Sequence, residues 1–413
     1  MRVYCAFAAA TFGDWFDMLA IQVLVGYRWH ADPLMLALIP VANALPSILL
    51  GSVAGVAADR LNKLRLMRVC DLLTAVLTLL ILLTPNMAWL LPILMLRAAI
   101  STLNVPAQQA LTRSIVREDQ LLQATSLNGI VNQGSKIAGP LLGGFVLSLL
   151  SPQWCIVICA VFRLGSYLLL LTVKAGESSA DKTSSGDTSS AVDQPAPPLR
   201  TLWKEGWSFI LGSRLLFITM LFGLTGALAI QMVDFQFTSL FRTVAPEQES
   251  LLGWMVAAAG AGAILSIVAM NRLKSTTKYG WKFGSGYTLI GLSVGGLGLL
   301  PVGVSILPVL LLGLLMGIGN GIFIVTFNYC LQKETPPFMI GRVFGIQNTV
   351  LGVVMIGAPL LGGLLVQLIG PARTFIYFGI VIAIIGLVGI VFGKILWRPT
   401  PSASVPVRSV TAE

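Results

Sequence analysis

The residues of this 413-residue chain best suited to chemistry are ionisable side chains that lie inside long apolar runs. Asp14 and Asp17 are three residues apart in the first run, so a helix places both carboxyl groups on one face. Arg97, Lys136 and Asp234 lie in later runs. A charged group at bilayer depth costs at least about 2.5–3.5 kcal/mol, so each of these residues is a candidate for function.

The neighbouring acids Asp14 and Asp17 suit a proton carrier. Asp14 lies twelve residues beyond Arg2, about 18 Å along a helix and close to the middle of a membrane. Two adjacent carboxyl groups in a low dielectric exchange a proton near neutral pH more readily than exposed ones do. A structural interpretation is also open, in which one acid forms a permanent ion pair with Arg97 or Lys136. Arg97 could instead bind an anion, or form a movable pair that protonation of the acid would release.

Further polar and aromatic residues could contact a ligand, although the same residues could equally serve as contacts between helices. Gln231 precedes Asp234 by three residues, and Asp234 could face a cavity or form a gating hydrogen bond. Arg163 is expected to snorkel or to pair locally. The candidate ligand contacts are Trp15, Asn104, Gln109, Gln231, Phe235, Asn320 and Asn328, with Phe237 beside them.

The composition excludes an ordinary soluble enzyme. Hydrophobic residues make up 56% of the chain and charged residues 11%, whereas soluble domains carry about 25% charged residues. The single histidine, His30, cannot form a catalytic or metal-binding pair, and the sequence has no phosphate-binding loop or nucleophile elbow. The five cysteines fit free buried thiols. The sequence therefore predicts no enzyme activity, no metal and no cofactor.

Twelve apolar runs are long enough to cross a membrane, since a spanning helix needs about 20 residues. They form two sets of six, and the seventh run lies near residues 214–241. The expected domains are an N-terminal six-helix bundle (1–173), a cytoplasmic linker with a possible amphipathic surface helix (174–213), a C-terminal six-helix bundle (214–396) and a flexible cytoplasmic tail (397–413).

A short repeat relates the two sets of helices. Residues 140–144 (PLLGG) recur as residues 359–363, and each copy lies in the fifth run of its set. Two similar halves of six helices are a recurring plan among transporters, with the substrate bound near the midplane between the halves.

The placement of the basic residues indicates the orientation of the chain. If both termini are cytoplasmic, 21 of the 27 Lys and Arg residues fall on the cytoplasmic side. Arg28, Arg242 and Arg373 alone fall on the outer side. The net charge of +10 therefore reflects membrane topology and does not indicate a nucleic-acid partner.

Several motifs resemble those of the major facilitator superfamily. Residues 55–63 (GVAADRLNK) resemble its loop signature, and residues 139–144 (GPLLGG) resemble the antiporter signature of its drug-efflux members. Residues 96–97 resemble its intramembrane arginine motif. Three further stretches are similar to the macrolide-efflux and enterobactin-exporter branch: residues 12–15, 105–110 and 341–343.

This resemblance covers residues 1–396 and implies an all-α membrane protein of twelve transmembrane helices in two pseudo-symmetric six-helix bundles. It implies a central cavity surrounded by the first, fourth, seventh and tenth helices, and a proton-coupled efflux of amphipathic drugs by alternating access. It also implies a cytoplasmic gate made of Gly55, Asp59, Arg60, Arg113 and Arg342, in which Asp59 would lie beside Arg342. The implied helix-packing motif is Gly139, Pro140, Gly143 and Gly144.

The expected partners are a small amphipathic organic substrate, protons and the lipid bilayer, for a monomer in a bacterial inner membrane. Two alternatives stay open on the same scaffold, namely export of a siderophore and movement of a lysolipid. An alternative of another class is a membrane receptor or scaffold that transports nothing. The intramembrane residues Asp14, Asp17, Arg97 and Lys136 argue against the last of these, since a scaffold has little use for them.

Overall fold

The structure, a computed structural model, describes residues 2–115, 121–173, 199–272, 279–336 and 339–397. Within these ranges the side chains of residues 52–60, 112–115, 121–130 and several single positions, including Lys136, lie outside the description. The described residues form helices and the turns between them, with no strand among them. The fold is therefore all-α, as predicted.

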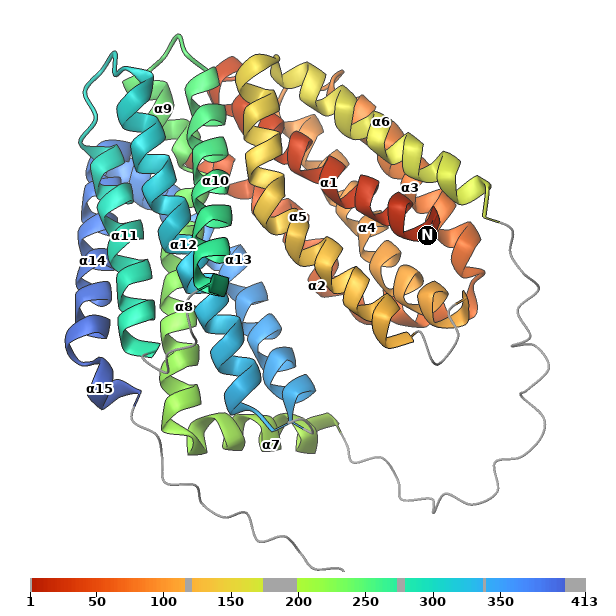
Figure 1. Cartoon of the computed structure of the whole chain (residues 1–413). Helices are drawn as coiled ribbons and strands as arrows, with labels where there is room; N and C mark the ends of the chain where they lie inside the picture. Colours follow the sequence, from red (N-terminus) through yellow and green to blue (C-terminus); the bar gives the residue numbers. More distant parts are fainter. Residues whose placement is uncertain (1, 116–120, 174–198, 273–278, 337–338, 398–413) are drawn as a thin grey trace, which may run out of the picture.

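The first half of the chain forms six long helices (Figure 1). In a helix the backbone N–H and C=O groups form hydrogen bonds with one another, which is the condition for crossing a bilayer. Proline lies inside α2, α4 and α5, as membrane helices tolerate. The elements are α1 (Arg2–Val23), continued by the π-helical turn η1 (Leu24–Arg28), α2 (Pro33–Arg60), α3 (Lys63–Ile81), α4 (Met87–Ile115), α5 (Leu121–Leu149) and α6 (Pro152–Leu171).

The second half repeats this plan and adds three short helices. The elements are α7 (Leu199–Gly212), α8 (Arg214–Asp234), α9 (Phe237–Val244), α10 (Ser250–Arg272), α11 (Tyr279–Gly298), α12 (Ile306–Glu334), α13 (Ile340–Ile369), α14 (Pro371–Val391) and α15 (Gly393–Leu396). The helix α7 occupies the segment for which the sequence predicts an amphipathic surface helix.

The seventh predicted span, near residues 214–241, is divided between two helices, because α8 ends at Asp234 and α9 begins at Phe237. The turn between the two helices contacts the other half, where the side chain of Gln236 donates a hydrogen bond to the carbonyl of Pro33 at the start of α2 (2.9 Å). Asp234 is the last residue of α8.

Nine helices in the described part of the chain are long and apolar enough to cross a membrane. The other three predicted spans, α3, α5 and α11, pack among them: α3 against α4 and α6, α5 against α1 and α10, and α11 against α12 and α14. The reduced apolarity of α3 comes from its four charged residues, Lys63, Arg65, Arg68 and Asp71. Large hydrophobic side chains are exposed on many of the helices, as is typical of a protein surrounded by lipid.

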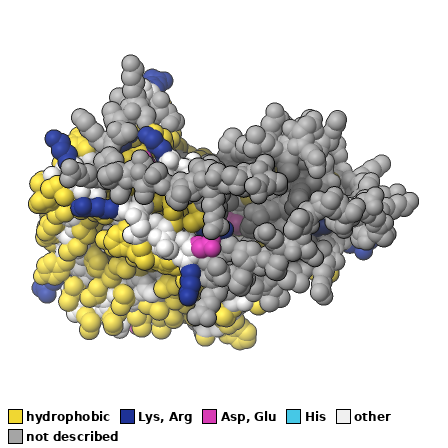
Figure 2. All heavy atoms as spheres, turned by 90° about the horizontal axis from the view of Figure 1, so that it is seen from below, with side chains coloured by type: hydrophobic (Ala, Val, Ile, Leu, Met, Phe, Trp, Pro, Cys, Tyr) yellow, Lys and Arg dark blue, Asp and Glu magenta, His cyan; other side chains and the backbone are white. Residues whose placement is uncertain are grey.

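The two halves touch along two pairs of helices, α5 with α10 and α2 with α13. Small residues bring the backbones close: a Cβ atom added to Gly144 would lie 2.6 Å from the Gly253 carbonyl oxygen, and one added to Gly363 would lie 2.8 Å from the Pro33 oxygen. These contacts lie toward the end of the molecule that carries α9, and the halves diverge toward the end that carries α7 (Figure 1). Seen from the α7 end, Lys and Arg side chains of the C-terminal half lie among hydrophobic ones (Figure 2).

Candidate functional site

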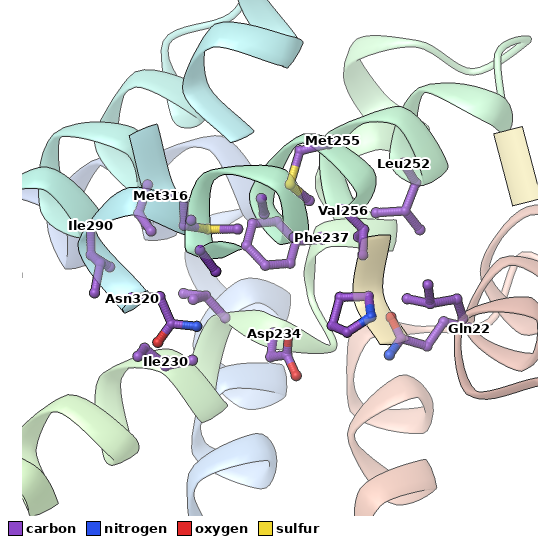
Figure 3. Close-up of a pocket in the computed structure, with 18 of the residues that line it drawn as sticks. Gln22, Ile230, Asp234, Phe237, Leu252, Met255, Val256, Ile290, Met316 and Asn320 are labelled. Carbon is purple, nitrogen blue, oxygen red and sulfur yellow. The ribbon is translucent and has the colours of Figure 1, made fainter. Parts of the chain in front are cut away.

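A cavity of about 160 Å³ lies between the two halves, where the helices converge (Figure 3). Most of its lining is apolar and includes the methionines Met18, Met255 and Met316. Helices α1 and α5 supply one wall, and α8, α9, α10, α11, α12 and α14 supply the rest. A mostly apolar pocket with a few placed polar groups is the usual form of a small-molecule site.

Three polar side chains interrupt the apolar lining, Gln22 from α1, Asp234 from α8 and Asn320 from α12 (Figure 3). Among the lining residues, all of which belong to the described part of the chain, Asp234 alone is ionisable. The break between α8 and α9 places its carboxyl group at the helix end. The cavity can therefore offer a carboxylate to a ligand while surrounding the rest of that ligand with hydrocarbon.

The first helix presents two different faces. Trp15, Met18, Leu19 and Gln22 line the cavity, and their spacing of three and four residues puts them on one side of α1. The acidic residues turn toward the interior of the N-terminal half instead. One helix thus separates the cavity from a set of charges inside the N-terminal half.

That set of charges joins four helices of the N-terminal half. Arg163 of α6 forms an ion pair with Asp14 of α1 (2.5 Å) and a second one with Asp71 of α3 (3.1 Å). Asp71 also accepts hydrogen bonds from Ser166 (2.5 Å) and from Asn104 of α4 (2.9 Å). We call Asp14, Arg163, Asp71, Ser166 and Asn104 the α1–α3–α6 network.

A second ion pair lies close by. Arg97 of α4 pairs with Asp17 of α1 and also donates to the hydroxyl group of Thr78 (3.4 Å). The side chain of Asp17 has no exposed surface, and its Oδ1 atom has no hydrogen-bond partner among the described residues. The permanent-pair interpretation of Asp17 therefore has a geometric basis, whereas Asp14 pairs with Arg163 and not with Arg97.

The structure corrects the expectation for Arg163. Its side chain is only 4% exposed and is held by carboxylates from two other helices, so it neither snorkels to an interface nor pairs locally. Asp71 had not been singled out, although it is a lone carboxylate in an apolar run and therefore meets the same criterion as Asp14. Gln22 was missed as well, and its signal is its place on the same helical face as Trp15.

The predicted ligand contacts divide between the cavity and other environments. Trp15 and Asn320 line the cavity, whereas Phe235 and Gln231 are outside its lining. Asn104 belongs to the α1–α3–α6 network, and the amide group of Asn328 donates to the Ile324 carbonyl of its own helix (3.0 Å). Gln109 is exposed.

The predicted gate and packing residues are only partly described. The side chains of Gly55, Asp59, Arg60 and Arg113, like that of Lys136, lie outside the described residues. The described ion-pair partner of Arg342 is Glu205 of α7. In the packing motif, Gly139 and Gly143 lie against Trp15 of α1, Pro140 lines the cavity, and Gly144 packs on α10.

The α9 end of the molecule is closed by polar contacts between the halves. Arg242 of α9 donates to the carbonyl groups of Gly26 and Ala31, both at 3.0 Å. Tyr27 reaches the carbonyl of Ala245 (3.5 Å), and a side chain at Gly26 would overlap Thr238. Because the charge pattern of the sequence predicts that this end faces outward, we call Arg242, Gln236, Tyr27 and their carbonyl acceptors the outer closure.

Metal binding finds no support in the described part of the chain, which contains no group of three or more His, Cys, Asp or Glu side chains that could hold an ion. The five cysteines are free, and all but Cys5 are buried.

Comparisons with known proteins agree with this geometry. The family model of the Major Facilitator Superfamily matches residues 3–359. The uncharacterized MFS-type transporter YfiS of Bacillus subtilis (strain 168) is 27% identical over 398 residues, covering 96% of this chain and 93% of that protein. The enterobactin exporter EntS of Shigella boydii serotype 18 is 26% identical over 272 residues, covering 64% of this chain and 59% of that protein.

Solved structures share the fold at low sequence identity. The nucleoside transporter NupG superposes with a TM-score of 0.67 at 12% identity, covering 97% of this chain and 98% of that one. A bacterial homologue of the human lysosomal transporter Spinster, in an inward-facing and unoccupied conformation, gives a TM-score of 0.64 at 13% identity and covers 96% of each chain.

Proposed function

The chain belongs to the major facilitator superfamily of membrane transporters, and we propose that it exports amphipathic organic molecules of drug type at the expense of a proton gradient. The observation that carries this proposal is the cavity between the halves. Its apolar lining suits hydrocarbon or aromatic groups, and the single carboxyl group of Asp234 suits a ligand that also carries positive charge.

Transport proceeds by alternating access. The outer closure and the contacts of α5 with α10 seal one end of the interface, while the halves diverge toward α7. The excess of Lys and Arg in the segments expected on the α7 side supports a cytoplasmic position for that side. The described conformation is then an inward-open one in a bacterial inner membrane, with both termini in the cytoplasm.

We assign proton coupling to the charged residues on the side of α1 that faces away from the cavity. Asp14 and Asp17 belong to the same helix that supplies Trp15, Met18 and Gln22 to the cavity. A change in the protonation of either acid alters its attraction to Arg163 or Arg97, and α1 transmits that change to the cavity wall. Substrate and proton therefore act on one helix from opposite sides.

Export of a siderophore is the second candidate, favoured by the similarity to the enterobactin exporter EntS. The cavity supports it less well. An anionic siderophore would meet the carboxylate of Asp234, and none of the described lining residues supplies a cation to balance it.

The test uses purified protein in proteoliposomes with an imposed pH gradient. The probes are a fluorescent organic cation, a macrolide, a catecholate siderophore and a lysolipid. The expected result is uphill movement of the cation and the macrolide, abolished by a protonophore. Siderophore movement alone would support the second candidate. A protein that moves none of the four under a gradient would support a receptor or scaffold, and would refute the proposal.

A further inference from the structure

Two buried glutamines of this chain differ in their hydrogen bonding. Gln236, in the turn after α8, uses both ends of its amide group: it donates to the Pro33 carbonyl (2.9 Å) and accepts from the Ser239 hydroxyl group (3.1 Å). Gln22 of α1 is only 3% exposed, yet its amide group has no hydrogen-bond partner among the described residues. Most buried side-chain polar groups in proteins have a partner, so an amide group without one points to a ligand.

The amide group of Gln22 opens onto the cavity between the halves. Figure 3 shows it pointing from α1 toward the wall that carries Asp234. Neither of its polar atoms is among the fully enclosed, unpartnered ones of the described residues, so both can be reached from the cavity. Gln22 also lies two residues before the π-helical turn η1, a local feature that is frequent at functional sites.

The polar side chains on the opposite wall are available as well. The side chains of Asp234 and Asn320 form no hydrogen bond or ion pair with a described residue. By contrast, Asn328, two turns further along α12, donates to the Ile324 carbonyl (3.0 Å). Three unpaired polar groups in one apolar cavity cost free energy unless something else binds them. A ligand that spans the cavity would be their common partner.

Gln22 decides which groups the N-terminal half can recognise in this cavity. None of the other lining residues from that half both donates and accepts hydrogen bonds, namely Trp15, Met18, Leu19 and Pro140. An amide group does both, so it matches another amide group or a hydroxyl group. A ligand with an acceptor alone would leave the Gln22 carbonyl oxygen unpaired.

We propose that Gln22 is a specificity-determining residue, which binds a neutral amide or hydroxyl group of the substrate while Asp234 binds its cationic amine. The substrate class is then an organic cation with an apolar body and a neutral group that both donates and accepts hydrogen bonds. Such a molecule lies across the interface, with its amine toward α8 and its neutral group toward α1. A cation without a hydrogen-bond donor in that group binds more weakly, because the site is left with an unpaired acceptor.

This inference deepens the proposed function and rests on it for the preference for cations, but the two fail separately. Proteoliposomes that show no uphill movement would refute export and would leave a difference in binding intact. Equal binding of two ligands that differ in one donor would overturn the role of Gln22 and would leave export possible.

The test is isothermal titration calorimetry of the purified full chain in detergent, with procainamide and procaine as probes. Both are cations with the same aromatic ring and tertiary amine, and procainamide has an amide N–H where procaine has an ester oxygen. We expect the wild-type protein to bind procainamide about fivefold more tightly, the effect of one hydrogen bond. Gln22→Met, which keeps the length of the side chain and removes its amide group, should bind the two probes equally.

Two results of this titration would overturn the proposal. One is a wild-type protein that binds neither probe or binds both equally. The other is a Gln22→Met protein that keeps the fivefold preference for procainamide, since the amide N–H would then be recognised by another residue.

Gln236→Met is the matched control, because it removes the same amide group from a glutamine whose partners lie within the protein. In the absence of ligand, Gln236→Met should lower the midpoint of thermal denaturation, since it breaks two hydrogen bonds. Gln22→Met should leave that midpoint at or above the wild-type value, because it removes a buried amide group that the described chain does not pair. A Gln22→Met protein that is destabilised as much as Gln236→Met, or does not fold, would show that Gln22 supports the fold and would overturn the proposal.

Discussion

At the scale of single residues, Asp234 distinguishes this cavity from a simple apolar pocket. It lies at the end of α8, just before the turn that Gln236 fixes against Pro33. Its position therefore depends on a contact between the halves rather than on α8 alone. In surroundings dominated by methionine, leucine and valine side chains, a carboxylate attracts a cation more strongly than it would in water.

The variant Asp234→Asn should separate charged from neutral ligands. We expect its affinity for an organic cation to fall about tenfold, equivalent to about 1.4 kcal/mol, and its affinity for a neutral amphipathic analogue to stay within about twofold. Equilibrium binding to purified protein, with the two ligands matched in size, measures the difference. Gln231→Ala, one turn earlier and outside the cavity lining, is the control. Equal losses for both ligands would show that Asp234 shapes the cavity instead of recognising charge.

Residue pairing is where the sequence was least informative. The intramembrane charges could be listed from the sequence, and Asp14, Asp17 and Arg97 were among them. Which carboxylate pairs with which arginine depends on the rotation of α1, α3, α4 and α6 about their axes. Asp14 pairs with an arginine on α6, whereas Asp17, three residues further along α1, pairs with one on α4. Asp71 could have been found by treating every charge in an apolar run alike.

At the scale of helices, the C-terminal half is held together by glycines at regular spacing. Gly284, Gly291 and Gly298 follow each other at intervals of seven along α11, and their contacts on α14 include the backbones near Gly379 and Gly386. Because lipid supplies no hydrophobic drive for helices to associate, such close backbone packing provides much of their attraction. The spacing was visible in the sequence, although the partner helix was not.

Gly379→Ala tests this packing. A Cβ atom at Gly379 would overlap the backbone of Gly295, so α11 and α14 must separate locally. We expect a loss of about 1–3 kcal/mol of stability, the usual cost of overpacking, seen as a lower midpoint of thermal denaturation in detergent. Gly165→Ala on α6, where a Cβ atom meets nothing within 4 Å, is the control and should match the wild type. Equal midpoints for the two variants would mean that the interface yields without cost.

The helix boundaries show which features of the fold a local sequence pattern can predict and which it cannot. Apolar length predicted the long helices because the bilayer imposes that length on each of them separately. It failed at the end of the seventh span, where the chain turns after Asp234 to form α9. Around that turn Gln236 and Arg242 donate hydrogen bonds to carbonyl groups of the other half, and no pattern within residues 214–241 predicts those acceptors.

At the scale of the whole molecule, the proposed alternating access requires at least two arrangements of the two halves, and no sequence pattern indicates which of them the chain adopts. A small set of contacts joins the halves in the observed arrangement. The outer closure joins η1 and the start of α2 to α9 through hydrogen bonds to backbone carbonyls, which any rotation of the halves would break. By contrast, Arg342 is held by Glu205 within the C-terminal half, so this ion pair does not tie the halves together.

Arg242 is the strongest element of the outer closure, because a single guanidinium group bridges two carbonyl groups of the other half. Each hydrogen bond to a charged group contributes about 1.5–3 kcal/mol, so Arg242→Gln should weaken the closed outer end by at least about 1.5 kcal/mol and raise the outward-open population at least tenfold. Arg242→Lys, which keeps the charge but loses the fork, should give an intermediate shift. Distances between spin labels placed on the outer ends of α2 and α13 measure these populations. If both variants kept the wild-type distance distribution, the closure would have to reside in the contacts of α5 with α10, and Arg242 would serve only to hold α9 in place.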